Sequence, residues 1–300
     1  MVVEEIQIKK ALNKLNSKFL PYKYDLNVYR GCSHHCQYCY ALYSHKYLEG
    51  GSNFFDTIYV KTNVVEALEK ELSSKRWKRE VVNLGGVTDS YQAIEEKYGL
   101  MREVLKLMIK YKTPITISTK SDLILRDIDL LTELAKVTMV NVAVTITTMN
   151  ENIRKKIEPG AMPSIRRLNV LKKLAGKNIG LGLHFMPILP MITDSEENIE
   201  NIFKEVSKVP IDYAICGMLN LRSFTRNNFL DFIKKDFPNL FNEYLKIYQS
   251  PFADKQYAKN VYSKIYKLKK KYNINSDYLK FLPKETIPKQ LDLLYLPNEK

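Results

Sequence analysis

Apolar residues recur along the first two thirds of the chain in two alternating patterns. Short runs of aliphatic and β-branched residues alternate with longer segments in which apolar residues recur every three or four positions, as Val65, Leu68 and Leu72 do. The short runs predict buried strands, and the longer segments predict amphipathic helices. The predicted strands are Lys23–Tyr29, Glu80–Leu84, Pro114–Thr119, Thr138–Thr147, Asn178–Pro187 and Tyr213–Met218. The predicted helices between them are Thr62–Trp77, Gly99–Lys112, Leu125–Lys136, Pro163–Lys177 and one whose apolar face carries Ile199, Ile202, Phe203 and Val206.

This strict alternation favours an α/β fold in which one parallel sheet is built with right-handed crossovers. Six strand-helix units fit an open barrel better than a closed barrel of eight strands. From about Arg222 the helical pattern continues without strands. We therefore expect a polar leader over residues 1–23, a barrel over 24–221 and a helical C-terminal extension over 222–300, with ligands bound at the C-terminal ends of the strands.

The composition is that of a folded globular protein, with 45% hydrophobic and 27% charged residues among 300. No apolar run approaches the roughly 18 to 20 residues that span a bilayer, and the first ten residues carry acids where a signal peptide needs an apolar stretch. The sequence therefore predicts a cytoplasmic protein without a membrane partner.

The net charge of +14 suits a polyanionic partner such as nucleic acid. Residues 216–300 contribute 16 Lys and Arg against 8 Asp and Glu, and tyrosines interleave with the lysines there. Two interpretations stay open, because base stacking with phosphate binding requires such a pattern, and so does helix packing with snorkelling lysines. The excess is mostly lysine, which a lysine-rich proteome also produces. The tyrosines concerned are Tyr244, Tyr248, Tyr257, Tyr262, Tyr266 and Tyr272.

The cysteines carry the clearest chemical signal. Cys32, Cys36 and Cys39 lie within eight residues, and Cys216 stands alone. A tight group of this kind indicates metal or redox chemistry rather than a disulfide framework. Three thiolates can hold an iron-sulfur cluster and leave one iron open for S-adenosylmethionine (SAM). The alternative is a zinc site that three cysteines complete with His34, His35 or His45.

At these residues the chain resembles a known family. The segment 27–41, Asn-Val-Tyr-Arg-Gly-Cys-Ser-His-His-Cys-Gln-Tyr-Cys-Tyr-Ala, resembles the cluster loop of radical SAM proteins related to spore photoproduct lyase, many of which are labelled DNA repair photolyase-like. The similarity extends from about Tyr24 to Arg222 through the segments 86–92, 118–122, 157–159, 166–168, 187–190 and 193–194.

The resemblance implies a partial (β/α)6 barrel with a [4Fe–4S] cluster on Cys32, Cys36 and Cys39, and with SAM lying across the strand ends. It also implies an external electron donor such as ferredoxin or flavodoxin. Reductive cleavage of SAM would give a 5′-deoxyadenosyl radical that abstracts hydrogen from a substrate.

Five residues near the cluster loop are expected to face SAM on this resemblance. Tyr38 takes an aromatic position near the adenine, although it also reads as a ring that fills the loop. Gly85 and Gly86 end the second strand, where backbone without a side chain approaches the methionyl part. Thr88 and Asp89 follow. The family often has Gly-Gly-Glu at this place, so Asp89 is expected to substitute for the missing glutamate.

Three further residues are expected to contact SAM at the ends of later strands. The resemblance places Ser118 and Lys120 toward the SAM carboxylate, whose charge a lysine complements. It places Thr145 near the ribose. A solvent-exposed Lys120 is the alternative. Glu158 and His184 have structural explanations first, as a loop anchor through Arg166 or Arg167 and as a core histidine.

The substrate is left open by the sequence. In spore photoproduct lyase a hydrogen-donating cysteine precedes the Thr/Ser-Asp element, but Gly86 and Val87 hold that place here, which argues against the same repair route. Cys216, at the end of the sixth predicted strand, is the spare thiol and thus a candidate hydrogen donor or an inert buried cysteine. A nucleic acid, a peptide or a small metabolite could be the substrate, and a non-enzymatic iron-sulfur or zinc protein is a further alternative.

Overall fold

The computed structural model describes residues 1–17, 20–47 and 54–275. Six parallel strands follow one another in sequence order across one sheet, with an antiparallel strand at one edge. Among the described strands, the first and the last of the six do not pair, so the barrel is open, as predicted. The six are β3 (Tyr24–Leu26), β6 (Val82–Leu84), β7 (Ile115–Thr119), β8 (Val140–Thr145), β9 (Gly180–Ile188) and β10 (Tyr213–Met218).

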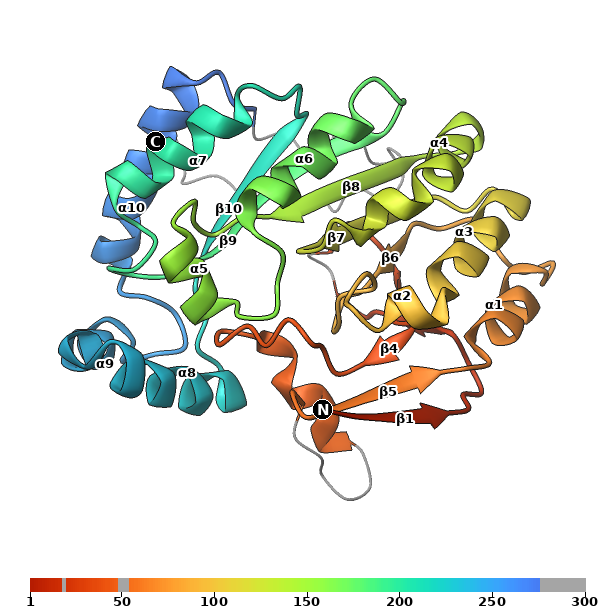
Figure 1. Ribbon diagram of the computed structural model, residues 1–300, viewed down its shortest axis with the longest axis horizontal. Coiled ribbons are helices and arrows are strands. Elements are labelled where there is room, and N and C mark those ends of the chain that lie inside the picture. The colour runs from red at the N-terminus through yellow and green to blue at the C-terminus, as the bar shows by residue number, and fades with distance from the viewer. Residues whose placement is uncertain (18–19, 48–53, 276–300) are drawn as a thin grey trace.

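Helices cover the outer face of this sheet (Figure 1). Their apolar stripes pack on the strands in one continuous core, to which Leu68, Val104, Leu131, Leu171 and Phe203 belong. The covering helices are α1 (Val64–Leu72), α3 (Leu100–Lys110), α4 (Ile128–Val137), α6 (Ser164–Leu174) and α7 (Glu196–Val206), and short helices precede three of them: α2 (Glu95–Tyr98), η2 (Leu123–Asp127) and α5 (Glu151–Ile157). Each predicted helix exists, and three of them are shorter at both ends than predicted, whereas α4 ends one residue later than predicted and α7 begins three residues before Ile199.

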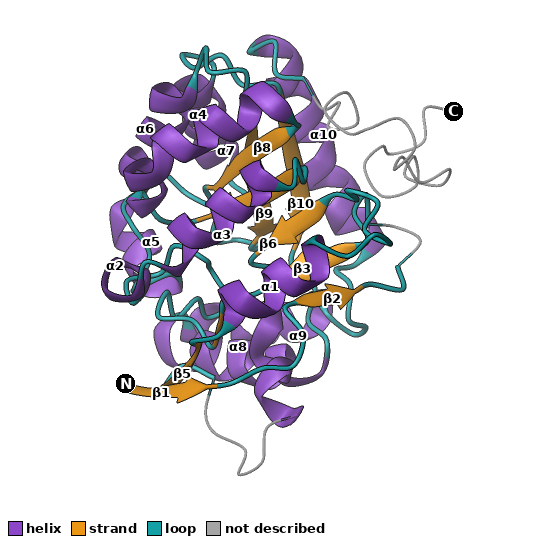
Figure 2. Cartoon of the chain, turned by 90° about the vertical axis from the view of Figure 1, so that its right-hand side faces the viewer, coloured by secondary structure: helices purple, strands orange, loops and turns teal. Residues whose placement is uncertain are grey.

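The N-terminal stretch, expected to be a polar leader, forms strands in two sheets. β2 (Leu12–Lys14) pairs antiparallel with β3 at the edge of the barrel. β1 (Val2–Ile6) pairs with β5 (Thr57–Lys61) in a separate three-stranded sheet, which β4 (Tyr29–Arg30) completes. Figure 2 shows β1 and β5 set apart from the barrel strands. The domain boundaries themselves stay a prediction.

The first predicted strand, Lys23–Tyr29, was too long. The barrel strand ends at Leu26, and Tyr29 belongs to the second sheet. β5 had no counterpart among the predicted elements, because all five of its residues are buried and show no alternation. Its last residue, Lys61, donates to the Asn27 carbonyl oxygen at 2.6 Å, and burial lowers the pKa of its ammonium to about 8.

The C-terminal extension is helical in its described part and packs on the barrel. It contains α8 (Ser223–Asp236), η3 (Pro238–Leu240), α9 (Phe241–Ile247) and α10 (Lys255–Lys271). α10 contacts α7, and α8 contacts η1 (Tyr40–Tyr47), which directly follows the cysteine loop. A second apolar core joins the extension to that loop, since Cys36 and Tyr38 belong to it together with Phe229, Ile233 and Tyr244.

The tyrosines of the extension serve mainly in packing. Tyr244 and Tyr248 are fully buried, and their rings stack with centroids 5.9 Å apart. Three others form hydrogen bonds to barrel residues through their hydroxyls: Tyr257, Tyr262 and Tyr272. Of the six, Tyr266 alone is largely exposed, at 62%. The structure therefore favours helix packing over a stacking surface for these residues.

In the described parts of the chain, none of the helices combines the length and the apolar character needed to cross a membrane.

We predict that the extension stabilises the barrel through its buried aromatic residues. Phe229 is fully buried beside Tyr244, with ring centroids 5.4 Å apart. Phe229→Ala should therefore lower the free energy of unfolding by about 3 to 5 kcal/mol, the usual cost of truncating a buried aromatic residue. Phe224→Ala, on the same helix at 45% exposure, is the control and should cost below about 1 kcal/mol. Urea denaturation followed by circular dichroism measures both, and equal losses would contradict the prediction.

Candidate cluster and SAM site

The cysteine loop leaves β4 through a glycine that no other residue could replace without strain. Gly31 has φ +86°, and a Cβ there would lie 2.3 Å from the Thr57 carbonyl oxygen. Cys36 is buried, Cys32 and Cys39 are half-buried, and all are free thiols. A turn closes the loop where the Cys39 N–H donates to the Cys36 carbonyl oxygen at 3.0 Å. The loop thus presents its three sulfur ligands within one compact segment.

Burial keeps these thiols protonated when no metal binds them. It raises the pKa of Cys36 to about 12, although the Lys120 charge acts in the opposite direction. Burial also raises the pKa values of Cys32 and Cys39, and the Asp89 carboxylate adds to the effect at Cys32. Because metal binding requires thiolates, it must release protons here.

Asp89 holds the cysteine loop against the barrel. Its carboxylate accepts from the Thr119 hydroxyl at 2.8 Å and from the backbone N–H groups of Tyr91 and Lys120 at 2.9 and 2.8 Å. His34 Nε2 lies 2.9 Å from the same carboxylate. Burial alone would raise the pKa of Asp89, but the charge and hydrogen bond of His34, together with the two N–H groups, hold it well below its usual range. These contacts indicate a positioning role, and the expected contact of Asp89 with SAM stays a prediction.

His34 also joins the loop to the segment after α5. Its Nδ1 lies 3.2 Å from the Gly160 carbonyl oxygen, and the Gly160 N–H donates to the His34 carbonyl oxygen at 3.0 Å. Both ring nitrogens therefore face oxygen atoms, one of Asp89 and one of Gly160. A Cβ on Gly160 would lie 2.0 Å from the Ser33 carbonyl oxygen, so only glycine allows this approach.

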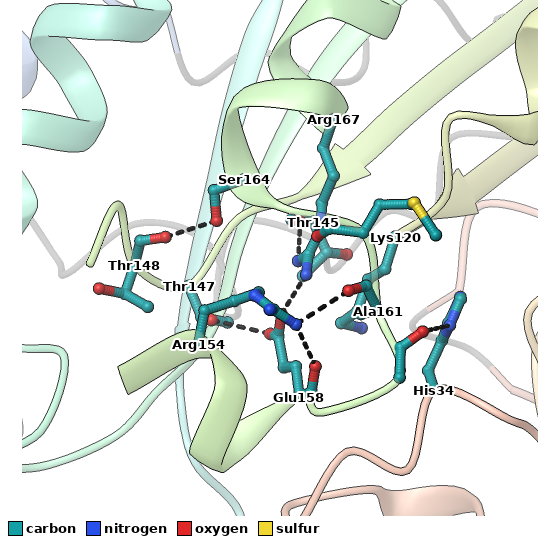
Figure 3. Close-up of polar contacts among 12 residues, drawn as sticks. His34, Lys120, Thr145, Thr147, Thr148, Arg154, Glu158, Ala161, Ser164 and Arg167 are labelled. Atoms are coloured by element: carbon teal, nitrogen blue, oxygen red, sulfur yellow. Dashed lines mark hydrogen bonds and ion pairs between the residues drawn. The ribbon is translucent and has the colours of Figure 1, made fainter. Parts of the chain in front are cut away.

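A buried ion pair supports the loop from the other side (Figure 3). Glu158 and Arg167 are both fully buried, with Oε2 and Nη2 2.6 Å apart. The other Glu158 oxygen accepts from the Thr147 hydroxyl at 2.8 Å and from the Tyr38 hydroxyl. Arg167 also donates to the Thr145 carbonyl oxygen at 2.9 Å, at the end of β8. The expectation that Glu158 anchors a loop through a nearby arginine is thus confirmed for Arg167.

The ion pair sets the charge state of Glu158. Burial would raise the pKa of its carboxyl group, but the charges of Arg167 and Lys120 outweigh burial and lower the pKa to about 2. Tyr38 is therefore fixed by an ionised carboxylate, and its ring lies under the Lys120 ammonium, with Nζ 5.7 Å from the ring centroid. Its expected role near the adenine stays a prediction.

Lys120 lies between the cysteine loop and the end of β7. Burial would lower the pKa of its ammonium, but the charges of Cys36 and Glu158 raise it above its usual value. Among the described residues, no carboxylate lies within ion-pair distance of its Nζ. A bound anion can therefore reach this cation without displacing a partner, which fits the expected contact with the SAM carboxylate.

Gly85, Gly86 and Thr88 connect the second barrel strand to the first. Gly85 has φ +92°, in the region that favours glycine. A Cβ on Gly86 would lie 2.5 Å from the Asp25 carboxylate, which accepts from the Gly86 N–H at 3.0 Å. The Thr88 hydroxyl donates to the Gly31 carbonyl oxygen at 2.5 Å. These contacts fix the loop, and the approach of SAM to the two glycines stays a prediction.

The barrel-facing ends of three adjacent strands carry a polar cluster. Ser118 Oγ of β7 lies 3.0 Å from His184 Nδ1 of β9 and 3.5 Å from Thr145 Oγ1 of β8 between them. The structure thus brings Ser118 and Thr145 together with His184, while their expected contacts with the SAM carboxylate and the ribose stay predictions. Sequence reasoning had taken His184 for a satisfied core histidine. Its Nε2 is buried and has no hydrogen-bond partner among the described residues.

Cys216 lies apart from these residues. Its side chain joins the core between the barrel and α10, near the Lys269 ammonium that weakly opposes the effect of burial on its pKa. On the same strand, Tyr213 and Ile215 pack with Met186 in a separate group. The structure therefore does not bring Cys216 to the barrel mouth, and its role as hydrogen donor stays a prediction that this placement disfavours.

A zinc site is the alternative use of the three thiols. Among the described residues, no three His, Cys, Asp or Glu side chains are close enough to hold one metal ion. A Cys3His zinc site would need a histidine nitrogen at about 2.0 to 2.1 Å from the ion, and both ring nitrogens of His34 already face oxygen atoms of Asp89 and Gly160. A four-iron cluster spreads its thiolates over separate irons, and three thiols on one loop fit such a group.

α8 covers the cysteine loop. The Thr225 hydroxyl donates to the Cys39 carbonyl oxygen at 3.1 Å, and the Asn228 amide donates to the Gln37 carbonyl oxygen at 2.7 Å. The extension therefore fixes the backbone on both sides of Tyr38. Sequence reasoning missed these contacts, because the residues of α8 lie 186 to 191 positions further along the chain and nothing in their local sequence indicates where the helix docks.

Comparisons with known proteins agree with this geometry. The family model described as "Radical SAM superfamily" matches residues 26–204, which include the cysteine loop, the four barrel strands β6 to β9 and the polar cluster. The chain belongs to the radical SAM superfamily. It is thus an enzyme of radical chemistry that uses an iron-sulfur cluster and SAM, and the non-enzymatic alternative is set aside.

Relatives and solved structures extend this result. An uncharacterized protein of Mycobacterium tuberculosis is 34% identical over 280 residues, which cover 91% of this chain and 82% of the relative. One of Methanocaldococcus jannaschii is 30% identical over 88% of this chain and 94% of the relative. A spore photoproduct lyase mutant with bound AdoMet and dinucleoside spore photoproduct has a TM-score of 0.67 at 14% identity, covering 90% of this chain and 79% of that one. The last match confirms the fold of the radical SAM barrel.

We predict that the ion pair of Glu158 makes stability depend on pH in acid. The pKa of Glu158 is about 2 in the folded chain against an ordinary 4.5. Its contribution should therefore be present above about pH 4.5 and be lost as the pH falls toward 2. Glu158→Gln should flatten the stability profile between these values, whereas Glu103→Gln, an exposed control, should not. Thermal unfolding of the metal-free protein at several pH values measures this, and parallel profiles for wild type and Glu158→Gln would contradict it.

Proposed function

We propose that the enzyme holds a [4Fe–4S] cluster with Cys32, Cys36 and Cys39, cleaves SAM reductively and uses the resulting radical to remove hydrogen from a substrate. The observation that carries the proposal is the combination of three thiols on one fixed loop with Lys120 beside them, a cation without a carboxylate partner among the described residues. When bound, the cluster and SAM would supply an electron and a 5′-deoxyadenosyl radical.

The residues around the loop would bind, orient and shield these groups. Lys120 would bind the SAM carboxylate, and the Thr145 hydroxyl would face the uncharged half of SAM. Ser118, expected at the carboxylate, would instead face the uncharged half, because its hydroxyl lies against His184 and Thr145. Glu158 and Asp89 would keep the loop fixed while charge changes at the cluster, because each is ionised and already paired. α8 would exclude water from one side of the loop. Reduction would need an external donor such as ferredoxin or flavodoxin, and a cytoplasmic location stays a prediction.

The proposal predicts that anaerobically reconstituted protein binds about four irons per chain and converts SAM to methionine and 5′-deoxyadenosine under dithionite. Cys36→Ala should abolish both, because two thiolates do not hold the cluster. Cys216→Ala should keep the iron and the cleavage, since Cys216 packs beside α10. Iron analysis and chromatography of the products measure the outcome. One zinc per chain without iron, or full activity of Cys36→Ala, would overturn the proposal.

A nucleic-acid substrate is supported by a feature other than the tyrosines. Arg222 and Phe252 are exposed where the chain leaves β10 for the extension, with the guanidinium 5.1 Å from the ring centroid. An exposed aromatic ring beside an arginine can stack a base and contact a phosphate. By contrast, part of the lysine charge on α10 is used internally, since Lys269 donates to the Ala214 carbonyl oxygen and Lys271 pairs with Glu200. A peptide or a small metabolite is the alternative substrate.

The salt dependence of oligonucleotide binding distinguishes a nucleic-acid substrate from a peptide or a small metabolite. If Arg222 contacts a phosphate, Arg222→Gln should flatten the dependence of log K on log salt by about one unit through the loss of one counterion-releasing contact. Lys172→Gln, an exposed change on α6, is the control and should leave the slope unchanged. Fluorescence anisotropy with single-stranded and duplex oligonucleotides measures both. Equal slopes, or no binding at moderate salt, would favour a peptide or metabolite.

A further inference from the structure

The polar cluster at the strand ends contains a hydrogen-bonding atom that the proposed cofactor contacts do not use. His184 pairs with Thr145 in the register of β8 and β9, and its neighbour Phe185 packs outward on Phe203 of α7. Since side chains alternate along a strand, His184 faces the barrel interior. Its Nδ1 is engaged with Ser118, which leaves Nε2 as the buried atom without a described partner.

Side chains fill the barrel interior below Ser118, Thr145 and His184. The Tyr213 hydroxyl donates to Asn141 Oδ1 at 2.7 Å across the interior, and the Tyr213 ring lies where a Cβ on Gly182 would come within 2.2 Å. The His184 and Tyr213 rings are 6.1 Å apart. Ser118, Thr145 and His184 therefore form a floor, and a ligand that enters from the cysteine loop ends its path at this floor.

The floor and the loop differ in charge. Lys120, beside the cysteine loop, is cationic. The floor is neutral, because burial and the Lys120 charge lower the pKa of His184 to about 4, so its imidazole carries no charge near pH 7. A ligand with a charged amino-acid end and an uncharged end matches this difference in charge in only one orientation. The charged end lies at the loop and the uncharged end at the floor.

The hydrogen-bonding capacity of His184 Nε2 restricts which chemical group of a ligand can bind there. If Ser118 donates to Nδ1, then Nε2 carries the proton and donates, and in the other tautomer Nε2 accepts. A hydroxyl group satisfies both cases, because it can donate and accept. We infer that His184 binds a ribose hydroxyl of the nucleoside half of SAM through Nε2, with Ser118 fixing the imidazole ring. This inference rests on the proposed function and adds a binding residue to it.

Binding of the two halves of SAM tests the inference. Isothermal titration of the reconstituted full chain with 5′-deoxyadenosine and, separately, with methionine distinguishes contacts to each half. His184→Leu should weaken 5′-deoxyadenosine binding about three- to tenfold, the usual effect of one neutral hydrogen bond, and leave methionine binding unchanged. Lys120→Ala should show the reverse pattern. His184→Gln, whose amide can replace Nε2, should restore part of the nucleoside affinity.

Nucleosides that lack one hydroxyl identify the contact. Wild type should discriminate against one of the two analogues, 2′,5′- or 3′,5′-dideoxyadenosine, namely the one that lacks the hydroxyl bound by His184. His184→Leu should lose that discrimination. Unchanged nucleoside affinity in His184→Leu, or an equal loss for methionine and nucleoside, would overturn the inference while leaving the proposed function intact. A wild type that binds neither half would overturn the proposed function itself. Melting temperatures of the variants check folding, and His184→Gln provides the test if His184→Leu does not fold.

Discussion

The Asp89 carboxylate joins the cysteine loop to the barrel, and the geometry of the site depends on this contact. It is buried, ionised and paired with His34 on one side and with Thr119 and the Lys120 N–H on the other. Removing one partner from such a group leaves a buried charge without compensation, which costs several kcal/mol. The loop therefore has little freedom to move relative to Lys120, whose position Asp89 fixes through its backbone.

Glu158 repeats this arrangement from the other side of the loop. It connects Tyr38, which lies between Cys36 and Cys39, to Thr147 and Arg167. Arg167 connects in turn to Thr145 at the end of β8. Two buried carboxylates thus tie one short loop to two different strand ends. The surroundings of a cluster held by such a loop would reorganise little when the charge of the cluster changes. This favours fast electron transfer and would keep SAM in a fixed position.

The sequence predicted the barrel because its strands and helices are local features. Six apolar runs and the helical stripes between them require only neighbouring residues to be recognised. β1 was missed because its residues are exposed and its strand conformation depends on pairing with β5, more than 50 residues away. The three cysteines of the loop were visible as a motif, whereas the contacts of Asn228 and Thr225 with the loop depend on where α8 docks. His184 was misread for the same reason, since its open Nε2 is visible only once three strands lie side by side.

A cluster held by only three cysteines would keep one iron open for SAM, and the proposed reaction depends on this open iron. Electron-nuclear double resonance on the reduced, reconstituted protein with SAM labelled at the amino nitrogen and the carboxylate tests this directly. We expect hyperfine coupling of both labels to the cluster, which requires SAM to chelate the open iron. A cluster signal that neither label perturbs, with a fourth ligand from the protein, would contradict the account.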